Sequence, residues 1–178
     1  MSAHMLTLAG IEEESIVDGP GLRFVVFTQG CPHHCKGCQN PQTHPFEGGK
    51  VHSIDDLLKC YDENPLLDGM TFSGGEPFAQ AESLAALAQG VHKRGGNVVT
   101  YTGYTYETLH KGVLDGNSAW QNLLSETDFL IDGPYIEKLR DLDLLFRGSS
   151  NQRILDKKSR ALLDEQNAAE KEKKTVNP

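Results

Sequence analysis

The sequence is short of basic residues. It has 17 Lys and Arg against 25 Asp and Glu, a formal net charge of −8 at pH 7. Residues 1–155 hold the whole acidic excess, with a net charge of −9, whereas residues 156–178 have a net charge of +1. Non-specific binding to nucleic acid depends on Lys and Arg that neutralise phosphates. We therefore expect no direct binding of nucleic acid.

Long apolar runs and a leader sequence are also missing. No stretch approaches the ~20 apolar residues that a membrane-spanning helix needs. Residues 1–10 lack the basic start and apolar stretch of a signal peptide. We therefore expect a cytoplasmic protein without membrane contact. Only four cysteines are present, and in a reducing cytosol these are more often ligands or catalysts than disulfides.

The 178 residues, 38% of them hydrophobic, suit one α/β domain. Strand and helix alternate four times, which is typical of βαβ units and a mainly parallel sheet. A complete eight-unit barrel needs ~250 residues, so this chain supplies about five or six units of a partial, open βα barrel. Strands are expected at residues 22–28, 69–72, 97–101 and 129–131, and helices at 53–63, 78–94, 104–115 and 118–125.

The domain is expected to comprise residues 1–155. The remaining segment, 156–178, is charged and nearly free of aromatic residues, so we expect a frayed helix or a flexible tail there. The sharpest motifs follow predicted strands, at the carboxyl edge where α/β proteins place their active sites.

A cluster of three cysteines is the central motif. Cys31, Cys35 and Cys38 have the spacing C-x3-C-x2-C. Their thiols can converge only if the loop curls around a common centre, and Gly37 permits a sharp turn. Soft thiolates select zinc, copper(I) or iron–sulfur centres. A closed zinc site needs four ligands, whereas three cysteines on a four-iron cluster leave one iron open to another ligand.

Zinc remains an alternative at this cluster. The three cysteines and one of His33, His34 or His44 could hold zinc in a non-catalytic adaptor. Otherwise His33 and His34 are interpreted as bystanders that fill the loop. Cys60, in the predicted helix at 53–63, is expected to be a small core residue.

These motifs together resemble a known superfamily. C-x3-C-x2-C after an early strand, followed by Gly-Gly-Glu after the next strand, resembles the radical S-adenosylmethionine (SAM) enzymes. The likeness covers roughly residues 6–156. Residues 17–21, 101–104 and 132–135 are similar to the activating enzymes of glycyl-radical enzymes, and residues 146–153 to the branch that activates the anaerobic ribonucleoside-triphosphate reductase.

The resemblance implies an oxidoreductase with a radical-SAM-type partial barrel. Cys31, Cys35 and Cys38 would hold a catalytic [4Fe–4S] cluster, and the amino and carboxylate groups of SAM would chelate its fourth iron. The reduced cluster would cleave SAM to methionine and a 5′-deoxyadenosyl radical. This radical would take a hydrogen from a glycine in the large subunit of the anaerobic reductase. A flavodoxin-like protein would supply the electron.

The resemblance also implies contacts with SAM around the strand ends. Gly74, Gly75 and Glu76 would receive the methionyl amino group, since glycines let a ligand approach the backbone. A plain strand-to-helix turn begun by Pro77 is the alternative. Thr102, just past the strand at 97–101, is expected to contact SAM or to cap and pack.

The third cysteine has its own expected contacts. Gly37 and Gln39 flank the third ligand, Cys38, and are expected to help bind the cofactor with it. The resemblance places the residue after that cysteine near the adenine, where Gln39 stands in place of the family's common aromatic residue and favours hydrogen bonding over stacking. Asp18 and Arg23 have weaker claims to a functional role. Residues 146–153 could be a solvated turn, or a site for the cofactor or for the partner's glycine loop.

Two other enzymes and one binding protein compete with the main hypothesis. They are an activase of formate-lyase type, a small radical enzyme that acts on a free metabolite, and the zinc adaptor. The absence of a second cysteine cluster disfavours the first, and residues 146–153 disfavour the second. A Gly-Gly-Glu segment at a strand end, for which a zinc adaptor has no need, disfavours the third.

Overall fold

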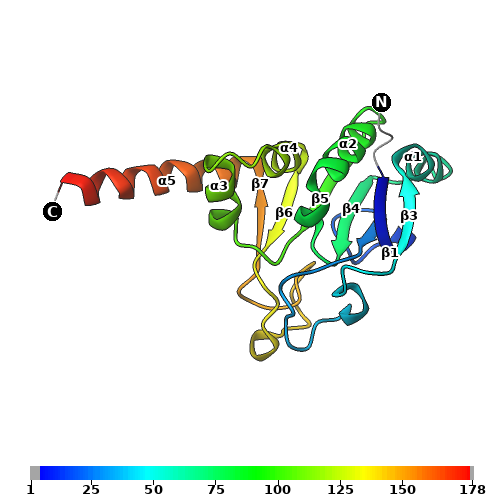
Figure 1. Cartoon of the computed structure of the whole chain (residues 1–178), viewed down its shortest axis with the longest axis horizontal. Coiled ribbons are helices and arrows are strands. Elements are labelled where there is room, and N and C mark those ends of the chain that lie inside the picture. The colour runs from blue at the N-terminus through cyan, green and yellow to red at the C-terminus, as the bar shows by residue number, and fades with distance from the viewer. Residues whose placement is uncertain (1–4, 177–178) are drawn as a thin grey trace.

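The computed structural model describes residues 5–176, and the side chains of those up to residue 170. They form one seven-stranded sheet in the order β3-β1-β2-β4-β5-β6-β7 (Figure 1). The strands are β1 (Met5–Ser15), β2 (Arg23–Thr28), β3 (Lys50–Ser53), β4 (Gly69–Gly74), β5 (Asn97–Tyr101), β6 (Phe129–Asp132) and β7 (Arg153–Asp156). The helices are α1 (Ile54–Asp62), α2 (Ala81–His92), α3 (Tyr106–Leu114), α4 (Ser118–Glu126) and α5 (Lys157–Val176).

The centre of the sheet is parallel and its edges are antiparallel. β2, β4, β5 and β6 pair in parallel, whereas β1, β3 and β7 pair antiparallel with their neighbours. β3 and β7 form opposite edges, so the sheet is open. The predicted α/β class with an open, mainly parallel sheet is confirmed. Five or six βα units is too high an estimate, because the antiparallel strands join the edges without a helical crossover.

One face of the sheet carries the main core. Apolar side chains from the strands, such as Phe24, Phe72 and Val98, meet Leu57 and Leu87 from the helices in one cluster. Successive strand residues point to opposite faces, which places Val25 and Val99 on the other side. These two are also fully buried, so the second face is covered as well. Part of that cover is the loop between β1 and β2, because a Cβ on Gly19 would lie 3.1 Å from Val99 Cγ2.

Helix α1 lies where the sequence pattern predicts a helix, at residues 53–63. Ser53 is its N-cap and accepts a hydrogen bond from the Asp56 amide. The helix buries Leu57 and Tyr61, one turn apart. Cys60 lies off this stripe and is exposed, so the expectation of a core cysteine is wrong.

The expected domain boundary after residue 155 falls within β7, whose last residue, Asp156, pairs with Phe129. Arg160 on α5 is buried and donates to the carbonyls of Leu124, at 2.7 Å, and Thr127. The start of this segment is therefore part of the domain, although α5 then extends away from the sheet (Figure 1). Residues 1–4 of the expected domain and 177–178 of the expected tail lie outside the described residues.

Within residues 5–176, no helix is long and apolar enough to cross a bilayer.

Candidate active site

A cleft of about 340 Å³ opens at the carboxyl edge of the parallel strands. Each of these strands contributes to its lining. Cys31 follows β2, Gly74 ends β4, Thr102 follows β5 and Gly133 follows β6. The expectation that the motifs gather at this edge is confirmed. They meet there because the parallel strands all end at the same edge of the sheet, and each motif lies at or just after the end of a strand.

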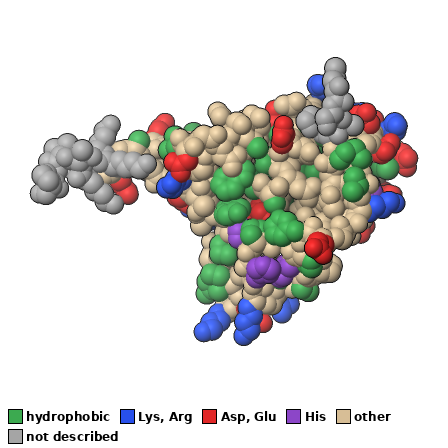
Figure 2. Space-filling model, in the orientation of Figure 1, with side chains coloured by type: hydrophobic (Ala, Val, Ile, Leu, Met, Phe, Trp, Pro, Cys, Tyr) green, Lys and Arg blue, Asp and Glu red, His purple; other side chains and the backbone are tan. Residues whose placement is uncertain are grey.

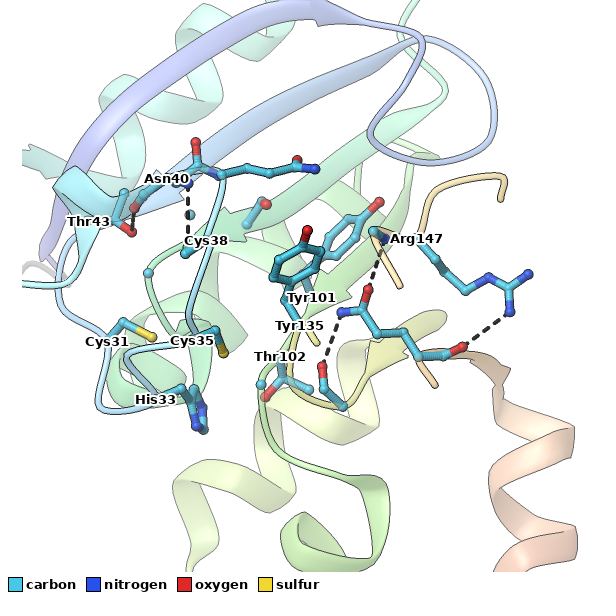
Figure 3. Close-up of a pocket in the computed structure, with 18 of the residues that line it drawn as sticks. Cys31, His33, Cys35, Cys38, Asn40, Thr43, Tyr101, Thr102, Tyr135 and Arg147 are labelled. Carbon is cyan, nitrogen blue, oxygen red and sulfur yellow. Dashed lines mark hydrogen bonds between the residues drawn. The ribbon is translucent and has the colours of Figure 1, made fainter. Parts of the chain in front are cut away.

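The three motif cysteines all line this cleft (Figure 3). Cys31 is buried, Cys35 and Cys38 are partly exposed, and all three are free thiols. The Cys31 amide donates to the His44 carbonyl at 3.0 Å, which pins the start of the loop. Burial raises the pKa of the Cys31 thiol above its usual range. A bound metal would reverse this preference, since coordination deprotonates a thiol.

The donor set fits an iron–sulfur cluster. Three soft sulfur ligands share one wall of a cleft, and a four-iron cluster presents a separate iron to each cysteine. Among the described side chains, no three His, Cys, Asp or Glu surround the position of a single metal ion. Cys31, Cys35 and Cys38 are the residues that could hold such a cluster.

Gly74 and Gly75 bring the end of β4 against the cysteine loop. Gly74 adopts a φ of +84°, and the Gly75 amide donates to the Thr28 carbonyl at 2.8 Å. A Cβ on Gly75 would lie 2.3 Å from the Gly30 carbonyl oxygen. The glycines therefore serve close backbone packing and also give the cleft a wall without side chains.

Two of the expected SAM-contacting residues do not line the cleft. Gly37 has a φ of +74° and its α-carbon faces the Glu137 carboxylate, so it shapes the loop. Glu76 is fully buried beneath the cleft wall. Its carboxylate accepts hydrogen bonds from Thr102 Oγ1 at 3.0 Å and from the Gly103 amide at 2.9 Å. Gln39 does line the cleft.

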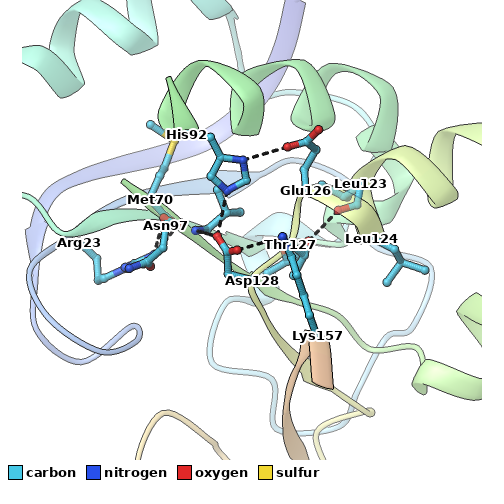
Figure 4. A network of polar contacts seen from close by, with 12 residues as sticks. Arg23, Met70, His92, Asn97, Leu123, Leu124, Glu126, Thr127, Asp128 and Lys157 are labelled. Carbon is cyan, nitrogen blue, oxygen red and sulfur yellow. Dashed lines mark hydrogen bonds and ion pairs between the residues drawn. The ribbon is translucent and has the colours of Figure 1, made fainter. Parts of the chain in front are cut away.

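Arg23 lies away from the cleft, at the amino ends of the strands (Figure 4). It is fully buried, and its guanidinium donates to Asn97 Oδ1 at 2.5 Å, the Met70 carbonyl at 2.7 Å and Thr71 Oγ1 at 3.1 Å. Burial lowers the pKa of Arg23 to about 10. These contacts tie β2, β4 and β5 together, which is a structural role.

The segment 146–153 forms the wall opposite the cysteines. Gln152 Oε1 accepts from the Gly148 amide at 2.9 Å, and its Nε2 donates to the Gly133 carbonyl at 3.1 Å. Tyr101 Oη donates to the Phe146 carbonyl at 2.7 Å. This segment is thus a bonded part of the cleft and not a solvated turn.

Most of the remaining lining residues fall in the segments that resemble the activating enzymes, namely 17–21, 101–104, 132–135 and 146–153. These segments lie in loops that meet only in the folded chain. Asp18 and Arg147 are the charged Asp, Glu, Lys or Arg side chains among the described lining residues. The remaining lining residues within those segments are Val17, Tyr101, Gly103, Gly133, Tyr135, Phe146, Gly148 and Gln152, and those outside them are Asn40, Thr43, Ser73 and Leu144.

A three-cysteine loop beside a glycine turn, at the carboxyl edge of an open α/β sheet, is the arrangement of a radical SAM enzyme. Residues 17–155 match the family described as "4Fe-4S single cluster domain". The anaerobic ribonucleoside-triphosphate reductase-activating protein of Salmonella typhi is 32% identical over 145 residues, covering 77% of this chain and 90% of that protein. This chain belongs to the family of anaerobic ribonucleoside-triphosphate reductase-activating proteins.

Two other relatives are also similar to this chain, and one of them is an activating enzyme of a different name. The Haemophilus influenzae protein of the same name is 33% identical over 149 residues, covering 78% of this chain and 90% of that protein. The pyruvate formate-lyase-activating enzyme of Clostridium pasteurianum is 37% identical over 131 residues, covering 68% of this chain but 49% of that protein. The resemblance inferred from the motifs is thus confirmed.

Proposed function

We propose that this chain activates an anaerobic ribonucleoside-triphosphate reductase by reductive cleavage of SAM, with a glycyl radical in the reductase as the product. One observation carries the proposal. Cys31, Cys35 and Cys38 line the same cleft as the backbone of Gly74 and Gly75. A cluster and a ligand that approaches the glycine wall would therefore share one enclosed space.

The cofactor would be held by this chain's own side chains. Cys31, Cys35 and Cys38 would ligate a [4Fe–4S] cluster with one open iron. When bound and reduced, the cluster supplies one electron that splits SAM into methionine and a 5′-deoxyadenosyl radical. The burial of Cys31 would keep water from that side of the site. The remaining chemistry belongs to the cofactors, and the protein supplies ligation, orientation and enclosure.

The cleft suits SAM in charge. It offers one carboxylate, Asp18, and one guanidinium, Arg147, while SAM carries both positive and negative groups. Arg147 has no carboxylate partner among the described residues, and it donates to the Gln152 carbonyl at 3.1 Å. Thr102 and Gln39 add a hydroxyl and an amide to the lining. These groups would orient SAM against Gly74 and Gly75.

Exposed apolar side chains at the mouth of the cleft support the proposal that the substrate is a protein. Val17 lines the cleft and is 70% exposed, and Leu142 and Leu145, either side of the lining residue Leu144, are 81% and 71% exposed. In Figure 2 the lower lobe shows hydrophobic and histidine side chains together, with Lys and Arg at its tip. Exposed apolar side chains that gather at a site are typical of contacts with another protein. The electron donor is proposed to be a flavodoxin-like protein, on the strength of the family resemblance.

An activase of formate-lyase type is the second candidate. The Clostridium pasteurianum enzyme supports it through identity over 131 residues. This chain spans about half of that enzyme but nine-tenths of the reductase-activating proteins, which favours the reductase as target.

A comparison of two partner proteins in separate reactions tests the proposal. The protein would be reconstituted anaerobically with iron and sulfide, then incubated with SAM, dithionite and either the reductase large subunit or pyruvate formate-lyase. We expect a glycyl-radical signal by electron paramagnetic resonance (EPR) in the reductase alone. A signal only in formate-lyase would support the second candidate. A colourless protein that holds zinc and releases no 5′-deoxyadenosine would support the zinc adaptor.

A further inference from the structure

Glu76 has the most fully bonded carboxylate near the cleft. It is completely buried, and its oxygens accept hydrogen bonds from the Phe78 amide, Thr102 Oγ1 and the Gly103 amide at 2.9–3.0 Å. His33 Nε2 lies 2.6 Å from its Oε2. A buried carboxylate requires such partners, because desolvation without them is costly. Of these partners, only His33 belongs to the cysteine loop.

His33 sits in a shaped slot at the end of β5. Its side chain is 16% exposed, and its ring meets Tyr104 edge-on with centroids 4.5 Å apart. A Cβ on Gly103 would lie 2.3 Å from His33 Cδ2, so the glycine makes room for the ring. Its neighbour in the same loop, His34, is exposed and contacts His44 with ring centroids 5.4 Å apart. The two adjacent histidines therefore have different environments.

We infer that Glu76 and His33 form a tether that fixes the cysteine loop to the end of β5. His33 lies between Cys31 and Cys35, whereas Thr102 and Gly103 follow β5, and all of these residues line the cleft. One carboxylate thus bonds the cysteine loop and the end of β5 and holds them together. Glu76 and His33 are positioning residues, acting through the loop and through Thr102. This role differs from the cofactor contact expected for Glu76 and the bystander role expected for His33.

The effect of the tether on the cluster rests on the proposed function, whereas the tether itself rests on contacts within the protein. The tether would set where the cluster lies relative to SAM, and the contacts that form it are within the protein. Residues that orient metal ligands from behind typically contribute 10–100-fold to metal affinity or activity. Loss of the tether should therefore weaken the response of the cluster to SAM while leaving all three cysteine ligands in place.

Three variants separate this role from general stability. His33→Ala removes the contact with Glu76. His33→Gln keeps an amide donor near the position of Nε2 and should restore the contact. His34→Asn is the matched control in the same loop, since His34 has a φ of +48°, which Asn tolerates. Urea unfolding of each variant verifies that the sheet is intact.

The first measurement needs no cofactor. Amide hydrogen exchange of the metal-free protein is followed at Cys31 and Cys38, whose N–H groups bond the His44 and Cys35 carbonyls. We expect faster exchange at these amides in His33→Ala, by about tenfold or more, and wild-type exchange in His33→Gln and His34→Asn. Unchanged exchange in a folded His33→Ala protein would overturn the tether.

The second measurement uses the reconstituted protein. Iron and sulfide per chain are determined, and SAM is titrated while the EPR spectrum of the reduced cluster is recorded. We expect the SAM concentration that gives half of the spectral change to be at least about tenfold higher in His33→Ala than in wild type. His33→Gln should be close to wild type. An identical titration in His33→Ala would contradict the positioning role. A wild-type protein that holds no cluster would refute the proposed function, and the exchange experiment would still decide the tether.

Discussion

Position 75 requires glycine because of its backbone neighbours. A Cβ there would lie 2.3 Å from the Gly30 carbonyl oxygen and 2.8 Å from that of Thr28. Neither atom belongs to a flexible side chain that could move aside. We expect Gly75→Ala to lower the free energy of unfolding by about 1–3 kcal/mol, the usual cost of overpacking. Urea denaturation measures this change.

Gly10 provides the control for that substitution. A Cβ on Gly10 would meet nothing within 4 Å, and its φ is not positive. Gly10→Ala should therefore stay within about 0.5 kcal/mol of wild type. Equal losses of stability in the two variants would contradict the assignment of Gly75 to backbone packing.

Cysteine substitutions distinguish ligands from the remaining thiol. Replacing Cys31, Cys35 or Cys38 by Ala should abolish the reconstituted cluster, because each would supply one of three ligands. Cys60→Ala should retain full iron, since Cys60 is exposed on α1. Iron and sulfide per chain are the measurement. Loss of iron in Cys60→Ala, or a complete cluster in Cys35→Ala, would show that the ligands are assigned wrongly.

Site residues that lie close together in the sequence were easier to predict than residues whose partners lie far away along the chain. The cysteines were recognisable because their spacing lies within one loop. The bonds of Glu76 were not, because His33 and Thr102 lie 43 and 26 residues away along the chain. A glutamate after two glycines carries no signal of such partners. Only the pairing of β2 with β4 and of β4 with β5 brings them together.

At the scale of elements, buried strands were predictable and exposed ones were not. β2 and β5 are rich in β-branched residues and largely buried, which gives a strong local pattern. β3 has four residues, two of them exposed, and β1 ends in a run of glutamates. β3, at the edge of the sheet, and β1, beside it, form through backbone hydrogen bonds to their neighbours. Their side chains therefore carry little trace of the strand.

The start of α5 offers a test at the same scale. Arg160 is buried and bonds two carbonyls at the end of α4, so its removal would leave these acceptors without donors. We expect Arg160→Ala to lower the free energy of unfolding by about 1–3 kcal/mol. Lys158→Ala, at an exposed position on the same helix, should change it by less than about 0.5 kcal/mol. Equal stability of the two variants in urea would show that α5 is not anchored there.

At the scale of the whole molecule, a polar network ties the helices to the sheet edge away from the cleft (Figure 4). His92 on α2 bridges Glu126 and Asp128, with both contacts at 2.9 Å. Lys157, at the start of α5, reaches Asp128 at 3.1 Å. Three parts of the chain, at His92, Asp128 and Lys157, therefore meet at one carboxylate.

Stability should fall in acid for this reason. Burial alone would raise the pKa of Asp128, but hydrogen bonds led by that from His92 outweigh it and lower the pKa. Hydrogen bonds from Arg153 lower the pKa of Glu107. A carboxylate whose folded pKa is depressed contributes stability that is complete above its unfolded pKa, about 4, and lost as pH falls through the folded pKa.

We therefore expect the free energy of unfolding from these groups to be constant between about pH 7 and pH 5 and to decrease below about pH 4. Glu107→Gln should make this decrease smaller. Urea unfolding at a series of pH values measures both. An identical decrease in the variant would show that the Glu107–Arg153 pair does not contribute.

Isotope transfer tests the central claim most directly. The reductase large subunit would be made with glycine deuterated at the α-carbon and activated by the reconstituted protein with SAM and dithionite. The account predicts that 5′-deoxyadenosine gains one deuterium, in an amount that matches the glycyl radical seen by EPR. Unlabelled 5′-deoxyadenosine alongside a full yield of glycyl radical would contradict it.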